Sequence, residues 1–174
     1  MSTDITLVLG GARSGKSRYA EGLAAASPGP RVYIATAQIW DAEMADRVAR
    51  HKEDRGPGWT TVEEPLDLPG ALRRNAGPGT NMLVDCLTLW LSNLMMADAD
   101  VPARSADLLA ALAAVEGRVV LVSNEVGLGI VPDNALARRF RDHAGRLHQD
   151  IAAVAQRVAF VAAGLPLLLK GKTP

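Results

Sequence analysis

The stretch Gly10-Gly11-Ala12-Arg13-Ser14-Gly15-Lys16-Ser17 decides the fold of this chain. Its spacing, a glycine, four residues and then Gly-Lys-Ser, is that of a phosphate-binding loop. An apolar run over residues 5–9 predicts a buried strand before it, and the pattern after it predicts a helix. In this arrangement backbone N–H groups and the helix N-terminus face phosphate oxygens, Lys16 reaches the β- and γ-phosphates, and Ser17 holds magnesium. A chance glycine turn is the alternative, and the flanking strand and helix disfavour it.

Length and composition favour one domain over residues 1–174, with enough chain for a substantial core. Lysine plus arginine and aspartate plus glutamate both number 19, so the net charge is zero, which argues against a general nucleic-acid surface. Cys86 is the only cysteine, which excludes an intrachain disulfide and fits a reducing compartment. Because no signal peptide and no apolar run near the roughly 20 residues of a membrane helix is visible, we expect a cytoplasmic location without a membrane span.

Apolar runs alternate with helical patterns along the chain, which is typical of parallel strands joined by crossover helices. We therefore expect an α/β fold of the P-loop NTPase type, with three layers and a mostly parallel central sheet. The expected strands are 6–9, 31–35, 81–84, 119–123, 157–161 and 165–169. The expected helices are 16–26, 41–54, 69–75, 87–97, 103–115 and 134–155.

The last predicted helix has the clearest pattern. Asn134 follows Pro132-Asp133 and is expected to cap its N-terminus. Apolar residues recur along it at spacings of three, four and seven, at Leu136, Phe140, Leu147, Ile151 and Val154.

Polar residues follow several of the predicted strands. Since ligands of open α/β sheets bind at the carboxyl ends of the strands, these residues are candidates for the site. The stretch Ala35-Thr36-Ala37 is small enough for a ligand to approach. Asp85 has two possible roles, holding magnesium through water or capping the helix 87–97. Glu125 follows another buried strand and is either a site group or a solvated loop carboxylate.

A histidine stands among cations in the predicted helix 41–54. Arg47, His51 and Arg55 fall at i, i+4 and i+8 and so share one side of the helix, with Lys52 adjacent. Positive neighbours disfavour the imidazolium and attract a triphosphate, so a neutral His51 can attack an α-phosphorus and form a phosphoramidate. The alternative is a helix histidine that packs on apolar neighbours near surface arginines, and the pattern alone favours this alternative.

The chain resembles the adenosylcobinamide kinase/adenosylcobinamide-phosphate guanylyltransferase family of cobalamin biosynthesis. The likeness covers nearly the whole chain and includes a later block that is not general among phosphate-loop proteins. The segments that carry it are Gly10–Ser17, Tyr33-Ile34-Ala35-Thr36-Ala37, the group Asp41, Glu43-Met44, Arg47 and His51-Lys52, the group Trp59, Thr61 and Glu63, and the later block Val122–Gly127, Gly129–Pro132 and Arg138–Asp142.

The resemblance implies two reactions. In the first, GTP or ATP gives its γ-phosphoryl group to the cobinamide hydroxyl. In the second, GTP guanylylates His51, releasing pyrophosphate, and the cobinamide phosphate takes the GMP to give adenosylcobinamide-GDP. It also implies a homotrimer, and Mg²⁺ at Ser17 and Asp85. The catalytic residues would be His51 and Lys16. The implied nucleotide contacts are Gly10, Gly11, Ala12, Arg13, Ser14, Gly15, Lys16, Ser17, Ala35, Thr36, Ala37, Lys52, Glu53, Asp54, Arg55, Glu63 and Asp85.

Two other functions stay open at this point. A plain small-molecule kinase would use the phosphate loop alone and form no covalent nucleotide intermediate. A non-catalytic nucleotide-binding switch would bind the nucleotide and phosphorylate no corrinoid.

Overall fold

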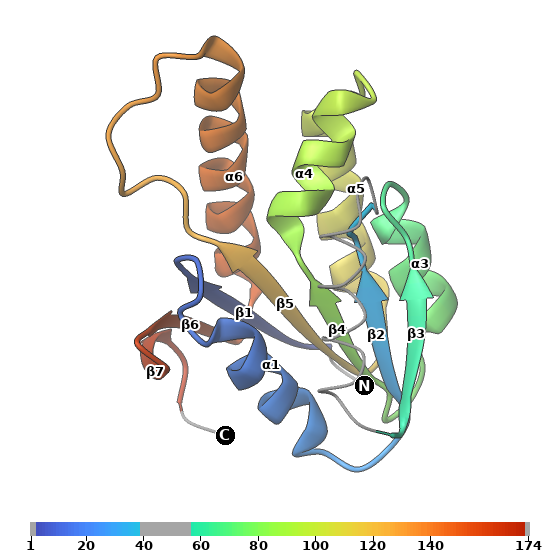
Figure 1. Ribbon diagram of the computed structural model, residues 1–174. Coiled ribbons are helices and arrows are strands. Elements are labelled where there is room, and N and C mark those ends of the chain that lie inside the picture. Colours follow the sequence, from blue (N-terminus) through green and yellow to red (C-terminus); the bar gives the residue numbers. More distant parts are fainter. Residues whose placement is uncertain (1–2, 39–56, 173–174) are drawn as a thin grey trace.

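One seven-stranded sheet forms the centre of the structure, a computed structural model that describes residues 3–38 and 57–172 (Figure 1). Its strands lie in the order β3-β2-β4-β5-β1-β6-β7. The neighbouring strands run parallel except β6 and β7, which are antiparallel, so the expected mostly parallel α/β fold is confirmed. The strands are β1 (Asp4–Gly10), β2 (Arg31–Ala35), β3 (Trp59–Glu63), β4 (Asn81–Asp85), β5 (Arg118–Asn124), β6 (Arg157–Ala162) and β7 (Leu165–Lys170).

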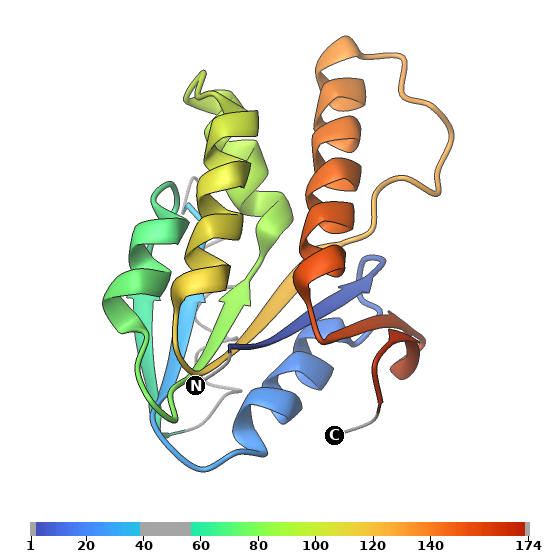
Figure 2. The same ribbon diagram turned by 180° about the vertical axis from the view of Figure 1, so that it is seen from behind.

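Helices cover both faces of the sheet (Figures 1 and 2). On one face α1 buries Ala20 and Ala24 against strand residues such as Val8 and Val122, and these small side chains let the helix lie close to the sheet. The other four helices in the described part of the chain pack over the opposite face, where Trp90 is fully buried. None of the helices in the described ranges is long and apolar enough to cross a membrane. The helices are α1 (Lys16–Ala25), α3 (Leu68–Asn75), α4 (Leu87–Met96), α5 (Val101–Ala114) and α6 (Ala135–Val154).

The six predicted strands are present, with ends within two residues of those predicted. The sequence did not predict β3, which lies at the edge of the sheet and, among the described residues, pairs only with β2. None of the five residues of β3 is fully buried, so its apolar pattern is weak and was missed. The predicted helix 41–54 lies outside the described residues.

The predicted start of α6 is confirmed, and part of its predicted apolar face is wrong. The Asn134 side-chain oxygen accepts hydrogen bonds from the backbone N–H groups of Leu136 and Ala137 at 2.7 and 3.2 Å. Leu136 is nevertheless 57% exposed and Val154 44% exposed. Leu136 lies in the first turn of α6, and the N-terminal part of this helix extends past the carboxyl ends of the strands (Figure 1). Val154 lies off the stripe of small and apolar side chains that α6 buries, at Ala144, Leu147 and Ile151.

Candidate nucleotide-binding site

The loop after β1 leads directly into α1, as the motif predicts. Gly15 has φ of +90° and occupies the N-cap position, and the helix begins at Lys16. Arg13 also has a positive φ, of 53°. Across the residues that the structure describes, no side chain caps this helix. The N–H groups of its first turn are therefore available to an anion, which the helix dipole also favours.

Close contacts with β6 and with the turn after it shape the loop. A Cβ on Gly10 would lie 2.5 Å from both the Ser14 hydroxyl and the Val161 carbonyl oxygen, so only glycine fits. The backbone N–H of Gly164, in the β6–β7 turn, donates to the Ser14 carbonyl at 2.8 Å. A Cβ on Gly15 would lie 3.0 Å from the Gly164 Cα. The β6–β7 hairpin thus braces the loop, a contact that the sequence did not predict.

Two polar side chains of the loop fit a phosphate ligand. The Ser14 hydroxyl is buried, and within residues 3–38 and 57–172 it has no hydrogen-bond partner. Such a buried group is costly unless a ligand or water satisfies it. The Lys16 ammonium is also buried and donates to the Gly11 carbonyl at 3.0 Å, so it lies over its own loop. Phosphate oxygens are acceptors suited to both groups.

Asp85 ends β4, at the same edge of the sheet as the loop. Its carboxylate accepts a hydrogen bond from the Tyr33 hydroxyl at 2.9 Å. The predicted alternative role as a helix cap is wrong, because Cys86 holds the N-cap position of α4 and no side chain in the described part of the chain caps that helix. Burial raises the pKa of the Cys86 thiol; the charge of Asp85 raises it further and that of Lys16 lowers it.

The predicted stretch at the end of β2 is tied to the end of β4. The Thr36 side chain is fully buried, and its hydroxyl donates to the Cys86 carbonyl at 2.7 Å and accepts from the Cys86 N–H at 2.9 Å. Its backbone N–H also donates to the Asp85 carbonyl at 3.2 Å. Thr36 therefore fixes the backbone beside Asp85, while Ala35 and Ala37 present only small side chains at this edge.

The remaining predicted carboxylates differ in their surroundings. Glu63 ends β3 and is exposed. The Glu125 carboxylate accepts from the backbone N–H groups of Gly127 and Leu128 at 2.7 and 3.1 Å, so it shapes its own loop. The described residues contain no group of three or more histidine, cysteine, aspartate or glutamate side chains that could hold a metal. A magnesium ion bound with a nucleotide needs fewer protein ligands, because phosphate oxygens and waters supply the rest.

The structure thus brings together the loop 10–17, Asp85 and the stretch 35–37 at the carboxyl edge. The other predicted site residues, His51, Lys52, Glu53, Asp54 and Arg55, lie outside the described residues. Sequence reasoning did not assign a role to Tyr33, which contacts Asp85. The alternation of side chains along a strand could have indicated Tyr33, because it places Tyr33 on the same face of β2 as Ala35, which belongs to the predicted site.

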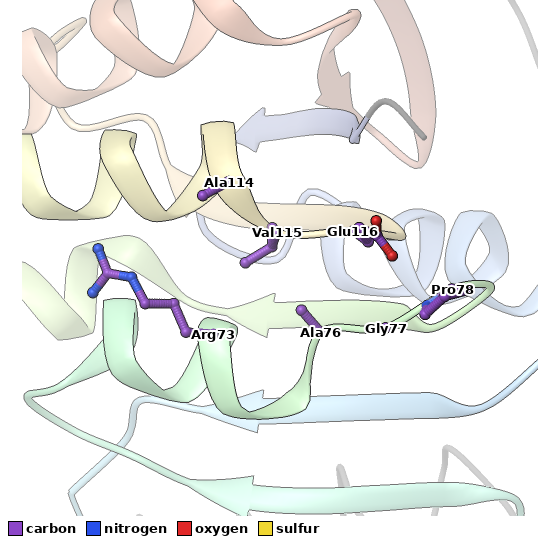
Figure 3. A pocket seen from close by; sticks show the side chains of 7 residues that line it. All are labelled: Arg73, Ala76, Gly77, Pro78, Ala114, Val115 and Glu116. Carbon is purple, nitrogen blue, oxygen red and sulfur yellow. The ribbon is translucent and has the colours of Figure 1, made fainter.

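A surface hollow lies at the opposite end of the strands. Its lining comes from the end of α3, the end of α5 and the loops that follow them (Figure 3). Arg73, one of the lining residues, has its guanidinium bound to the Asp107 carboxylate at 2.6 Å. Because these loops lead into the amino ends of β4 and β5, the hollow lies away from the phosphate loop and contains no predicted site residue. The lining residues are Arg73, Ala76, Gly77, Pro78, Ala114, Val115 and Glu116.

The strand, loop and helix geometry, set in a mostly parallel sheet, defines a P-loop α/β protein. The fold is shared with a solved ATPase of the type III secretion system of pathogenic bacteria (TM-score 0.56, 11% identity, 95% of this chain and 56% of that one). A solved protein of Pyrococcus horikoshii is also similar (TM-score 0.58, 10% identity, 98% and 87%). The sequence model of the family described as cobinamide kinase / cobinamide phosphate guanyltransferase matches residues 6–169, and the chain belongs to this family.

Curated relatives match along almost their whole length. The chain is 53% identical to the bifunctional adenosylcobalamin biosynthesis protein CobP of Pseudomonas aeruginosa, over 95% of this chain and 97% of that protein. It is 42% identical to the bifunctional adenosylcobalamin biosynthesis protein CobU of Salmonella typhimurium and 41% identical to that of Escherichia coli, in both cases over 94% of this chain and 98% of the relative.

Proposed function

We propose that this chain acts as a single domain that carries out two steps of cobalamin biosynthesis. In the first it phosphorylates adenosylcobinamide with GTP or ATP. In the second it transfers GMP from GTP to adenosylcobinamide phosphate, giving adenosylcobinamide-GDP and pyrophosphate. The observation that carries the proposal is the match of residues 6–169 to a family described by both activities.

The phosphate loop serves the first reaction. The hydroxyl oxygen of the cobinamide side arm bonds to the γ-phosphorus, the bond to the bridging oxygen breaks, and the hydroxyl proton is released. Lys16, the Ser14 hydroxyl and the N–H groups at the start of α1 stabilise the charge on the phosphate oxygens. Magnesium, held by Ser17 and Asp85 together with the nucleotide, neutralises further charge when bound.

His51 serves the second reaction. Its imidazole nitrogen bonds to the α-phosphorus of GTP, and pyrophosphate leaves. An oxygen of the cobinamide phosphate then bonds to the same phosphorus and displaces His51, which returns to its starting state. Support for this step comes from family membership and from the cationic neighbours Arg47, Lys52 and Arg55 in the sequence. In the second step Glu53, Asp54 and Glu63 are the remaining candidates for nucleotide contact.

Labelling with two forms of radioactive GTP tests this proposal. With α-labelled GTP, denaturing electrophoresis should show acid-labile label on the protein, whereas γ-labelled GTP should leave none. His51→Ala should abolish the label and retain phosphorylation of adenosylcobinamide, and His143→Ala is the matched control that keeps both. Phosphorylation without any protein label would favour the plain kinase. Nucleotide binding with neither product would favour the switch and contradict the proposal.

We also propose that the chain forms a homotrimer. The edge strand β7 supports self-association, because Leu165, Leu167 and Leu169 are 73%, 62% and 59% exposed at alternate positions. Exposed apolar side chains in such a row are typical of contact surfaces. Multi-angle light scattering should give three times the chain mass, and a monomer at assay concentration would contradict the trimer.

A further inference from the structure

A tyrosine hydroxyl lies against the carboxylate that ends β4. The Tyr33 hydroxyl donates to one oxygen of Asp85 at 2.9 Å, and only 5% of Tyr33 is exposed. We propose that Tyr33 is a positioning residue, which fixes the Asp85 carboxylate for the magnesium ion of the bound nucleotide. The proposal rests on the proposed function only in taking Asp85 as a magnesium-binding group.

Strand pairing and packing fix the Tyr33 ring. Ala35 of β2 pairs with Asp85 of β4, so Tyr33 stands two residues earlier on the same face of the sheet. On its other side β2 pairs with β3, and Trp59 of that strand meets the Tyr33 ring edge to face, with centroids 6.3 Å apart and planes at 86°. Held between two strands and against this indole, the hydroxyl has a defined position.

The carboxylate itself needs this support. Asp85 is the last residue of β4 and is only half-buried, so its side chain would otherwise rotate. The hydrogen bond from the Tyr33 hydroxyl to one carboxylate oxygen restricts the rotation of the group and so fixes its plane. Hydrogen-bonded partners of metal ligands commonly act in this way, and their loss lowers metal affinity by about 10- to 100-fold. Because we expect Asp85 to act through water, we take the lower end, about tenfold.

The test is the response of GTP binding to magnesium in Tyr33→Phe, which removes one oxygen atom. Affinity for a fluorescent GTP analogue is measured in excess Mg²⁺ and in EDTA. We expect the affinity in EDTA to stay within about twofold of wild type and the gain from Mg²⁺ to fall about tenfold. In the kinase assay the Mg²⁺ concentration for half-maximal rate should rise, and excess Mg²⁺ should restore kcat.

Three further variants separate positioning from structural effects. Tyr19→Phe changes the only other tyrosine of the chain and should keep the wild-type magnesium response. Asp85→Asn should lose most of the response. Trp59→Phe keeps an aromatic ring beside Tyr33 and keeps the Tyr33 hydroxyl, so it should lower Tm and reduce the magnesium response much less than Tyr33→Phe does. A wild-type response in Tyr33→Phe, or in Asp85→Asn, would overturn the proposal.

A measurement on the unmutated protein keeps the proposal testable if Tyr33→Phe does not fold. With carbon-13 in the tyrosine rings, the chain gives signals from two tyrosines only, and Tyr19→Phe assigns them. Adding Mg²⁺ to the GTP complex should move the Tyr33 signal and leave that of Tyr19 in place; an unmoved Tyr33 signal would overturn the proposal. These readouts need no cobinamide, so failure of the proposed function appears separately, as absence of phosphorylated or guanylylated product.

Discussion

Replacing Gly10 by alanine should destabilise the fold, because two atoms occupy the space of the new Cβ. The Ser14 hydroxyl and the Val161 carbonyl oxygen would each lie 2.5 Å from it. The serine side chain can rotate away, but the carbonyl belongs to β6, which pairs with β1 through Gly10 itself. Overpacking of this kind costs about 1–3 kcal/mol, and a backbone atom as the neighbour favours the upper half of that range. We therefore expect a loss of about 2–3 kcal/mol in unfolding free energy.

Gly11→Ala is the matched control for this prediction. Within the described ranges nothing lies within 4 Å of a Cβ at Gly11. Urea unfolding of both variants measures the difference, and in a domain of this size the loss in Gly10→Ala corresponds to a fall in Tm of about 4–12 °C. A Gly10→Ala variant within about 0.5 kcal/mol of wild type, a typical surface-substitution effect, would refute the steric argument. So would a Gly11→Ala variant that loses as much as Gly10→Ala.

Two further predictions concern buried polar groups near the site. Thr36→Val should lose about 1–3 kcal/mol of unfolding free energy, since the buried Cys86 N–H loses its partner while the Cys86 carbonyl keeps the hydrogen bond from the Trp90 N–H. Thr36→Ser should recover most of this loss in urea unfolding. The His148 ring lies 2.7 Å from the Ser123 hydroxyl, and burial lowers the pKa of this histidine. The contribution of the neutral His148 to the unfolding free energy is therefore complete above the ordinary pKa of 6.5, and it is lost as the pH falls through the lower pKa of the folded state. His148→Gln should therefore flatten the loss of stability between pH 7.5 and 5, and His143→Gln should leave it; equal pH profiles for wild type and His148→Gln would contradict this.

The sequence predicted those parts of the fold whose signals are local. The loop motif placed the start of α1 at Lys16, and Asn134 marked the start of α6. It could not predict β3 from apolar pattern, because an edge strand buries few side chains. The contact of Gly164 with the phosphate loop was equally hidden, since it joins segments about 150 residues apart and depends on strand order. Tyr33 was missed for the same reason: its partner Asp85 becomes a neighbour only once β2 pairs with β4.

Strand order also bears on how Asp85 can serve a nucleotide. β5 lies between β1, which carries the loop, and β4, which ends at Asp85. Neighbouring strands lie about 4.8 Å apart, so about 9.6 Å of sheet separates the loop strand from the carboxylate strand. Asp85 of β4 pairs with Val122 of β5, whereas Gly10 of β1 pairs with Asn124, two residues further along β5. At that separation the Asp85 carboxylate cannot contact phosphates bound in the loop directly. A hydrated cation bound to those phosphates can bridge the distance between the loop and the carboxylate. If Asp85 binds such a cation, as we propose, the direction of the carboxylate oxygens matters more than their reach, and the hydrogen bond from the Tyr33 hydroxyl restricts that direction.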